Sequence, residues 1–283
     1  MRVYKIIIYL MILIYISIII IFGFVINNKN LNLNYVLTKL EKIEQKERDK
    51  RKIIIFGRST CEFGLQAEKF EREFGIPSYN LCSSAYEYED LQLLSQLSKK
   101  LSNKDIIIFS KRFPFENENI QLNLFSNFFI PNIYGRLKSL YNYNIRNDGI
   151  LSKRESNMNE NGDKLIFKKR QEDFDFINYD SVKLNVATEN LIEQLAEIEK
   201  IQNKNSIKII VVSPPILSSN EDQKKIDSII KNLRGKKLNK NMTWIYPLIF
   251  NNKEFFIDDN HVNKKGRDIW TKFLIEILEK NLN

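Results

Sequence analysis

The stretch KIIIFGRSTCEFG, Lys52–Gly64, predicts how this chain folds. It begins with a short run that is apolar on both faces and stops at Gly57, which is typical of a buried strand in a parallel sheet. Ser59 follows just past that strand and just before a helical pattern. A serine on such a turn is exposed at the sheet edge, where the first N–H groups of the helix suit an oxyanion. The alternative is that Ser59 or Thr60 simply caps the helix.

The alternation of short apolar runs and helical patterns continues toward the C-terminus. We expect strands at Lys52–Gly57, Ser78–Cys82, Asp105–Ser110, Ile207–Pro215 and Met242–Pro247. We expect helices at Glu62–Gly75, Glu87–Ser102, Ser181–Gln202, Glu221–Gly235 and Lys264–Leu282. The fold class is therefore α/β, a three-layer α/β/α sandwich with a mainly parallel sheet, and its site should form at the carboxyl ends of the strands. No linker divides residues 52–283, so we expect one domain.

The stretch Lys111–Asp180 does not fit this alternation. It is rich in Asn and aromatic residues, shows no clear periodicity, and is too long for a simple connection. We expect an insertion with some helix of its own near Asn132–Tyr143, lying over the strand ends. The alternative is a loose surface excursion.

The only histidine of the chain, His261, lies three residues after Asp258 in the sequence DDNH. At that spacing in a tight turn, the Asp258 carboxylate can hold the Nδ1–H of the imidazole while the other ring nitrogen faces the strand ends. Ser59, His261 and Asp258 would then be nucleophile, base and orienting acid. Asp259 is only two residues from His261, and a carboxylate at that spacing usually points to another face, so we do not expect it to orient the imidazole. The alternative is a structural histidine.

The N-terminal residues 1–28 predict a transmembrane anchor. The uncharged run Ile6–Ile26 is long enough, as a helix, to cross a hydrocarbon core of about 30 Å. No small-residue cleavage site follows it; the alternative is a cleaved signal peptide. Arg2 and Lys5 precede the run, so we expect a single-pass membrane protein with a cytoplasmic N-terminus and an extracytoplasmic domain. Residues 29–51 would form a charged helical stalk.

The formal net charge is +9, from 44 lysines and arginines against 35 acidic residues. A basic extracytoplasmic domain favours anionic lipid head groups or polyanionic polymers, and nucleic acid is not expected because no aromatic and basic binding motif is present. Two cysteines and one histidine make no zinc spacing, and no motif calls for a cofactor. Outside the cell, Cys61 and Cys82 could form a disulfide or remain two half-buried thiols.

Taken together, these blocks resemble the SGNH (GDSL-type) hydrolase family, which has an α/β/α, flavodoxin-like sandwich. FGRST stands where that family has its G-D-S block, and DDNHVNKKG is similar to its D-x-x-H block before the last helix. The resemblance implies Ser59, Asp258 and His261 as catalytic residues. Arg58 replaces the usual Asp. The Gly of the family's second block would fall near Cys82 or Ser83, so no Gly is present there.

The third block reads SKRF, without the Asn that helps to hold an oxyanion, so Arg112 or Lys111 would have to substitute. Cys82, Ser83 and Arg112 are therefore the expected oxyanion or substrate-binding residues. With its anchor, the chain is similar to the membrane-anchored cell-envelope O-acyltransferases and esterases of this family, the D-alanyl transfer protein type. That likeness implies a multispanning membrane acyltransferase as partner and an anionic glycan or polyol polymer as substrate. The alternative is a non-catalytic glycan-binding or assembly protein on the same fold.

Overall fold

The computed structural model describes residues 4, 9–15, 17, 36–37, 39–83, 90–112, 158–165, 167, 181–219, 224, 226–228, 230–231 and 243–282. The chain divides into two compact units, one made of Met1–Glu41 and Gln121–Ile150 and one made of Lys42–Ile120 and Leu151–Asn283. Among the described residues, no helix has both the length and the hydrophobicity that crossing a bilayer requires. Much of Ile6–Ile26 lies outside the described residues, so the anchor stays a prediction.

The second unit contains a five-stranded sheet in which every pair of strands is parallel. The strands follow the order β2 (Ser78–Asn80), β1 (Ile53–Gly57), β3 (Ile106–Ser110), β4 (Lys208–Val212) and β6 (Thr243–Ile245). The three central strands are runs of Ile, Val and Phe, and their long apolar side chains are almost completely buried. Such runs fit only a sheet that is covered on both faces.

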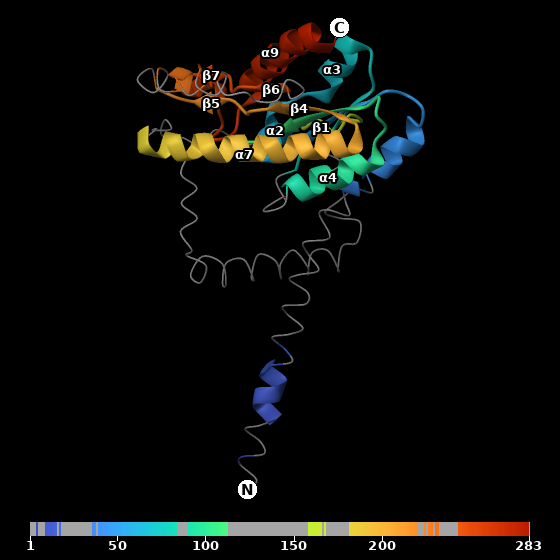
Figure 1. Cartoon of the computed structure of the whole chain (residues 1–283), viewed down its shortest axis with the longest axis vertical. Coiled ribbons are helices and arrows are strands. Elements are labelled where there is room, and N and C mark those ends of the chain that lie inside the picture. The colour runs from blue at the N-terminus through green and yellow to red at the C-terminus, as the bar shows by residue number, and fades with distance from the viewer. Residues whose placement is uncertain are drawn as a thin grey trace. The chain divides into compact units, whose positions relative to one another are not determined.

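Helices cover both faces of this sheet (Figure 1). One face carries α3 (Ala67–Phe74) and α9 (Lys264–Leu282), and the other carries α4 (Asp90–Lys100) and α7 (Ser181–Asn205). The short helix α2 (Ser59–Gly64) follows β1 directly and contacts α9. An α/β fold with a mainly parallel sheet is therefore present, as the sequence predicts. The sequence did not predict the second, two-stranded parallel sheet of β5 (Ile216–Leu217) and β7 (Ile249–Phe250), which precedes the 3-10 helix η1 (Lys253–Phe255).

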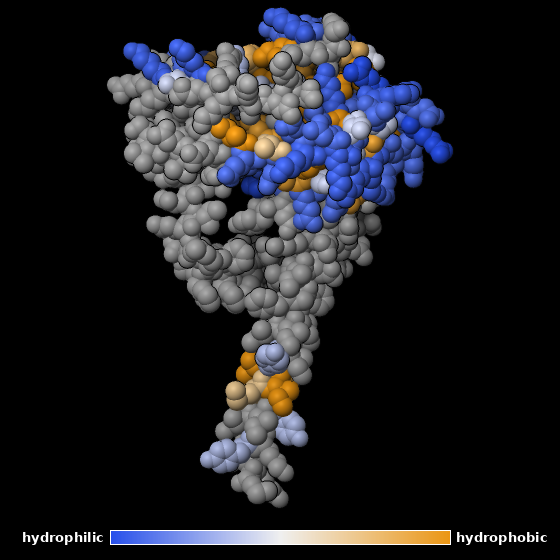
Figure 2. All heavy atoms as spheres, viewed as in Figure 1, coloured by the Kyte–Doolittle hydropathy of each residue, from blue (hydrophilic) through white to orange (hydrophobic). Residues whose placement is uncertain are grey.

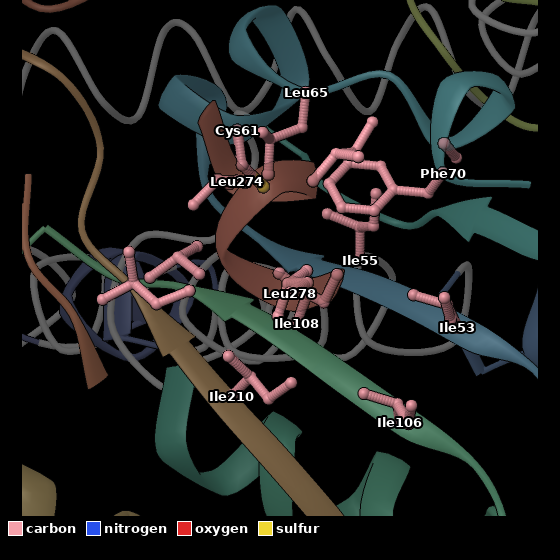
Figure 3. Close-up of a cluster of buried hydrophobic side chains, with 14 of the residues drawn as sticks. Ile53, Ile55, Cys61, Leu65, Phe70, Ile106, Ile108, Ile210, Leu274 and Leu278 are labelled. Carbon is pink, nitrogen blue, oxygen red and sulfur yellow. The ribbon is translucent and has the colours of Figure 1, made fainter. Parts of the chain in front are cut away.

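The core follows from the alternation of side chains along each strand. Ile53 and Ile55 of β1 point to the face covered by α3 and α9, where they join Phe70 and Leu274 in a buried cluster (Figure 3). The intervening residues point to the opposite face, where the rings of Phe56 and Phe109 stack with their centroids 5.5 Å apart.

The helix expected at Glu62–Gly75 is two helices, because the chain breaks between α2 and α3. A Cβ on Gly64 would lie 2.4 Å from the ring of Trp270, so only glycine lets α9 pack this closely. The next residue, Leu65, is extended and completely buried. The break exposes the N-terminus of α3, where Asp163 accepts hydrogen bonds from the backbone N–H groups of Ala67 (2.6 Å) and Glu68 (2.9 Å).

The end of the predicted stalk packs against the amino-terminal edge of the sheet. Lys52, only 1% exposed, forms ion pairs with Glu44 (3.2 Å) and Asp105 (3.4 Å). The hydroxyl of Tyr79 donates to Glu47 (3.1 Å), and burial of the phenol beside this carboxylate raises the pKa of Tyr79. These buried contacts attach residues 44–52 to the domain.

Two predicted segments fall mainly outside the described residues. Of the insertion Lys111–Asp180, only 111–112, 158–165 and 167 are described, and of the helix expected at Glu221–Gly235, only scattered residues are. The described surface of the second unit is largely hydrophilic in the view of Figure 2. In the first unit, the side chains of residues 9–15 are exposed and mostly apolar.

Candidate active site

The turn after β1 is built around Gly57, which has a φ of 154°. A Cβ at this position would lie 2.3 Å from the carbonyl oxygen of Ser110 on the neighbouring strand, so no other residue fits. The N-cap of α2 is Arg58, with no side-chain capping bond, and Ser59 is the first helical residue. The alternative that Ser59 or Thr60 caps this helix is therefore wrong.

The loop between η1 and α9 is closed by backbone contacts. Phe256 and Val262 form an isolated antiparallel bridge, and Ile257 N–H donates to the His261 carbonyl (2.7 Å). Inside the loop, Asp258 Oδ1 accepts from the backbone N–H groups of Asn260 (2.9 Å) and His261 (2.8 Å). These bonds fold the Asp258 carboxylate back over the turn, onto the side of the imidazole.

The imidazole of His261 lies between the Asp258 carboxylate and the Ser59 hydroxyl. Nδ1 is 2.8 Å from Asp258 Oδ1 and 2.9 Å from Oδ2, and Nε2 is 2.8 Å from Ser59 Oγ. A carboxylate can only accept, so a neutral ring must carry its proton on Nδ1 and accept the Ser59 proton on Nε2. Asp259 is exposed and accepts instead from the Asn260 side chain (3.0 Å).

The charge state of Asp258 suits this arrangement. Partial burial raises the pKa of the Asp258 carboxyl, but the hydrogen bond from Asn260 N–H and the proximity of His261 outweigh it, so the pKa lies below its ordinary value. Asp258 therefore stays ionised at neutral pH and continues to hold Nδ1–H.

A disulfide between Cys61 and Cys82, whose Cα atoms are 5.8 Å apart, joins α2 to the segment that follows β2. The sequence left this pairing open. The backbone N–H of Cys82 donates to Asn80 Oδ1 (3.0 Å), and that of Ser83 donates to the Gly57 carbonyl (3.0 Å). These two N–H groups thus make hydrogen bonds within the protein, and the oxyanion or substrate-binding role of Cys82 and Ser83 stays a prediction.

A cluster of charged residues occupies the end of β3. Arg112, the third of the expected oxyanion or substrate-binding residues, donates through Nη1 to Asn260 Oδ1. It therefore lies against the loop that holds His261. Its neighbour Lys111 is 3.4 Å from the buried carboxylate of Asp90, which also receives Arg58 Nε at 2.8 Å. Sequence reasoning missed Asp90. The signal for it lies in the two strand ends: Gly57 pairs with Ser110, so the cations that follow, Arg58 and Lys111, lie side by side and call for a carboxylate between them.

The described part of the chain contains no group of three or more His, Cys, Asp or Glu side chains that could hold a metal ion.

No family model and no curated protein matches the chain. Among solved structures, a GDSL-like lipase from Bacteroides thetaiotaomicron is 14% identical, with a TM-score of 0.44, and the match covers 88% of this chain and 98% of the lipase. A family two carbohydrate esterase from Clostridium thermocellum and an acetyl xylan esterase from Butyrivibrio proteoclasticus are each 12% identical, with a TM-score of 0.39 and 82% of this chain covered. The match spans 64% of the length of each esterase. Because all three TM-scores are below 0.5, the function has to be argued from the site itself.

Proposed function

We propose that this chain is a serine acyltransferase or esterase that acts on O-acyl groups. The observation that carries the proposal is the line Asp258–His261–Ser59, with contacts of 2.8 Å on both sides of the imidazole. A serine hydroxyl is a weak nucleophile until an adjacent base takes its proton, and an ionised carboxylate on the far side keeps that base in the correct tautomer.

In this mechanism Ser59 Oγ forms a bond to the acyl carbon while its proton passes to His261 Nε2. The tetrahedral intermediate collapses, the bond to the leaving alcohol breaks, and His261 returns the proton to the alcohol oxygen. The acyl group is then an ester on Ser59. Water or a second hydroxyl attacks that ester and loses its proton to His261 Nε2; the bond from the acyl carbon to Ser59 Oγ then breaks, and His261 returns the proton to Ser59 Oγ. The N–H of Cys61, in the first turn of α2, already donates to the Arg58 carbonyl (3.1 Å), so the N–H of Ser59 itself, at the first helical position, would be the donor to the developing oxyanion.

The proposed substrate is an O-acylated cell-envelope polysaccharide or a teichoic-acid-like polymer, and the proposed location is the outer face of the cell membrane. The uncharged run Ile6–Ile26 supports an anchor, Arg2 and Lys5 support a cytoplasmic N-terminus, and the net charge of +9 suits an anionic polymer. The Cys61–Cys82 disulfide supports an oxidising compartment. A multispanning membrane acyltransferase would supply or receive the acyl group. Digestion of the domain by protease added to intact cells tests the orientation, and a protected domain would contradict it.

A non-catalytic glycan-binding or assembly protein is the second candidate. The observation in its favour lies at β2 and β3, where the N–H groups of Cys82 and Ser83 are already bonded and no Asn occupies the SKRF segment. Such a protein would keep the fold and bind its polymer without turnover.

Labelling by a fluorophosphonate probe separates the two candidates. The probe reacts with an activated serine, so the full-length protein should become labelled and the Ser59→Ala variant should not. Thr60→Ala is the matched control, because it removes the adjacent hydroxyl from the same turn and should label normally. A wild-type protein that does not label, or a Ser59→Ala variant that does, would favour the binding protein or another nucleophile.

A further inference from the structure

Phe63 lies beside the imidazole of His261. It follows Ser59 by four residues in α2, so the two side chains share one face of that helix. The ring of Phe63, 7% exposed, has its centroid 5.1 Å from that of the imidazole, at an interplanar angle of 59°. The bonds to Asp258 and Ser59 hold the two nitrogens of the imidazole along a line, but they leave the ring free to rock about that line. A large ring packed beside the imidazole opposes this rocking.

Phe63 is itself held from outside α2 by Lys164. The Lys164 ammonium lies 3.9 Å from the centre of the Phe63 ring, a cation–π contact, and 3.1 Å from Glu62 Oε1. Glu62 is 3% exposed, so its carboxylate fixes the ammonium in place. Phe167 adds an edge contact to Phe63, with ring centroids 6.1 Å apart.

The segment that carries Lys164 is attached to other elements of the domain. The backbone N–H of Asn80 in β2 donates to the carbonyl of Asn161 (2.7 Å), and Arg267 Nη1 in α9 donates to the Lys164 carbonyl (2.6 Å). The Asp163 carboxylate, in a residue 3% exposed, caps α3 as described above. These bonds fix the backbone of residues 158–165, and with it the position of Lys164 relative to α2.

We propose that Phe63 is a positioning residue that holds the imidazole of His261 in line with Ser59, and that Lys164, paired with Glu62, keeps Phe63 in place. This proposal rests on the proposed function, because the alignment matters for proton transfer from Ser59. It assigns part of the long insertion to the chemical step, where the sequence had suggested only a cover for the site. The effect should therefore appear in kcat and leave KM nearly unchanged.

His261 is the only histidine, so histidine labelled with ¹⁵N and ¹³C reports on this one imidazole by NMR in the full-length protein in detergent. Phe63→Leu should split the imidazole signals into more than one set or broaden them, beyond the uniform shift that follows from loss of the ring current. Phe63→Tyr keeps the ring and should restore a single set. Lys164→Gln, which removes only the cation, should have a smaller effect of the same kind. Lys69→Gln is the control, because Lys69 pairs with Asp268 at the surface (2.9 Å) and should leave the signals unchanged.

The rates should follow the same order. Misplacement of a reacting group by about 1 Å can cost about 100-fold, so Phe63→Leu should slow fluorophosphonate labelling and kcat by about 10- to 100-fold. Lys164→Gln should slow them by about twofold to fivefold, and Phe63→Tyr should stay near the wild-type rate. A loss that appears only in KM would overturn the positioning role.

The NMR measurement separates failure of this proposal from failure of the proposed function. If the wild-type protein does not label but Phe63→Leu still splits or broadens the imidazole signals, the function is wrong and the positioning contact stands. If Phe63→Leu keeps a single sharp set of imidazole signals, the proposal is wrong whatever the activity. Should Phe63→Leu not fold, Lys164→Gln decides the question, since unchanged signals and an unchanged rate would also overturn the proposal.

Discussion

The loop that carries Asp258 and His261 differs from the strand ends that carry Cys82, Ser83 and Arg112. In the loop, backbone bonds within one turn aim the carboxylate at the imidazole, and the imidazole reaches Ser59. At the strand ends, a disulfide and a cluster of charged side chains are present, and the SKRF segment lacks the Asn that would help to hold an oxyanion. The side chains that a proton transfer from Ser59 requires are therefore in contact, whereas the usual hydrogen-bond donors to an oxyanion are not found among the described residues of these strand ends. Mutations on the two sides should therefore differ in the size and kind of their effects.

The largest effect should come from His261→Ala. Without a base, Ser59 keeps its proton, and by analogy with serine proteases the rate should fall about 10⁶-fold. The loop is held by backbone bonds, so circular dichroism and the melting temperature should change little. The rate of ester hydrolysis, measured in a discontinuous assay, gives the size of the loss. A variant that hydrolyses ester at the wild-type rate would remove the serine mechanism and favour the binding protein.

Asp258→Asn should come next, with a loss of up to about 10⁴-fold, because an amide leaves the imidazole in the wrong tautomer. Asp259→Asn is the matched control in the adjacent position, and its effect should be mild because Asp259 is exposed and accepts from the side chain of Asn260 (3.0 Å). The same ester assay measures both. Equal losses in the two variants would contradict the assignment of Asp258 as the orienting acid.

Arg112→Ala tests the strand-end side. If the guanidinium takes over the role of the missing Asn, the rate should fall about 100-fold or more. Arg112 also bonds Asn260, so Asn260→Ala serves as control for an effect through the loop. A rate that falls in Arg112→Ala and not in Asn260→Ala would assign Arg112 to the oxyanion. Equal losses would assign it to holding the loop.

The double change Cys61→Ser and Cys82→Ser should mainly affect stability. The disulfide closes a loop of 21 residues, and its loss should reduce the free energy of unfolding by about 3 kcal/mol. Denaturant titration of the two proteins measures the difference. A fall in labelling rate much larger than the loss of folded protein would show that the disulfide also positions the turn that carries Ser59.

The smallest effect concerns the pH dependence of stability. The pKa of Asp258 is lower in the folded chain than in the unfolded chain, so its ionised form stabilises the fold above the unfolded value of about 3.9. That contribution disappears as the pH falls through the folded pKa. The stability difference between wild type and Asp258→Asn should therefore be present at pH 7 and should shrink below about pH 4. A difference that stays constant down to pH 2 would contradict the lowered pKa.

Much of the fold and part of the site could be predicted from local sequence. The strands were predictable because runs such as Ile53–Ile55 are apolar on both faces and fit only a covered parallel sheet. The contact of Asp258 with His261 was predictable because three residues of spacing allow it within one turn. The break after Gly64 was not, because it depends on the ring of Trp270, which lies in α9.

The sequence by itself determined the elements and the local turns, since these depend on side-chain periodicity and on bonds between residues a few positions apart. Only the tertiary structure decided which turns meet. Ser59 and His261 are 202 residues apart in sequence, and they come together because parallel strands end at one edge of the sheet. The Cys61–Cys82 disulfide and the contact of Lys164 with Phe63 have the same origin. No local pattern encodes them, because the energy of each contact depends on packing between segments that are distant along the chain.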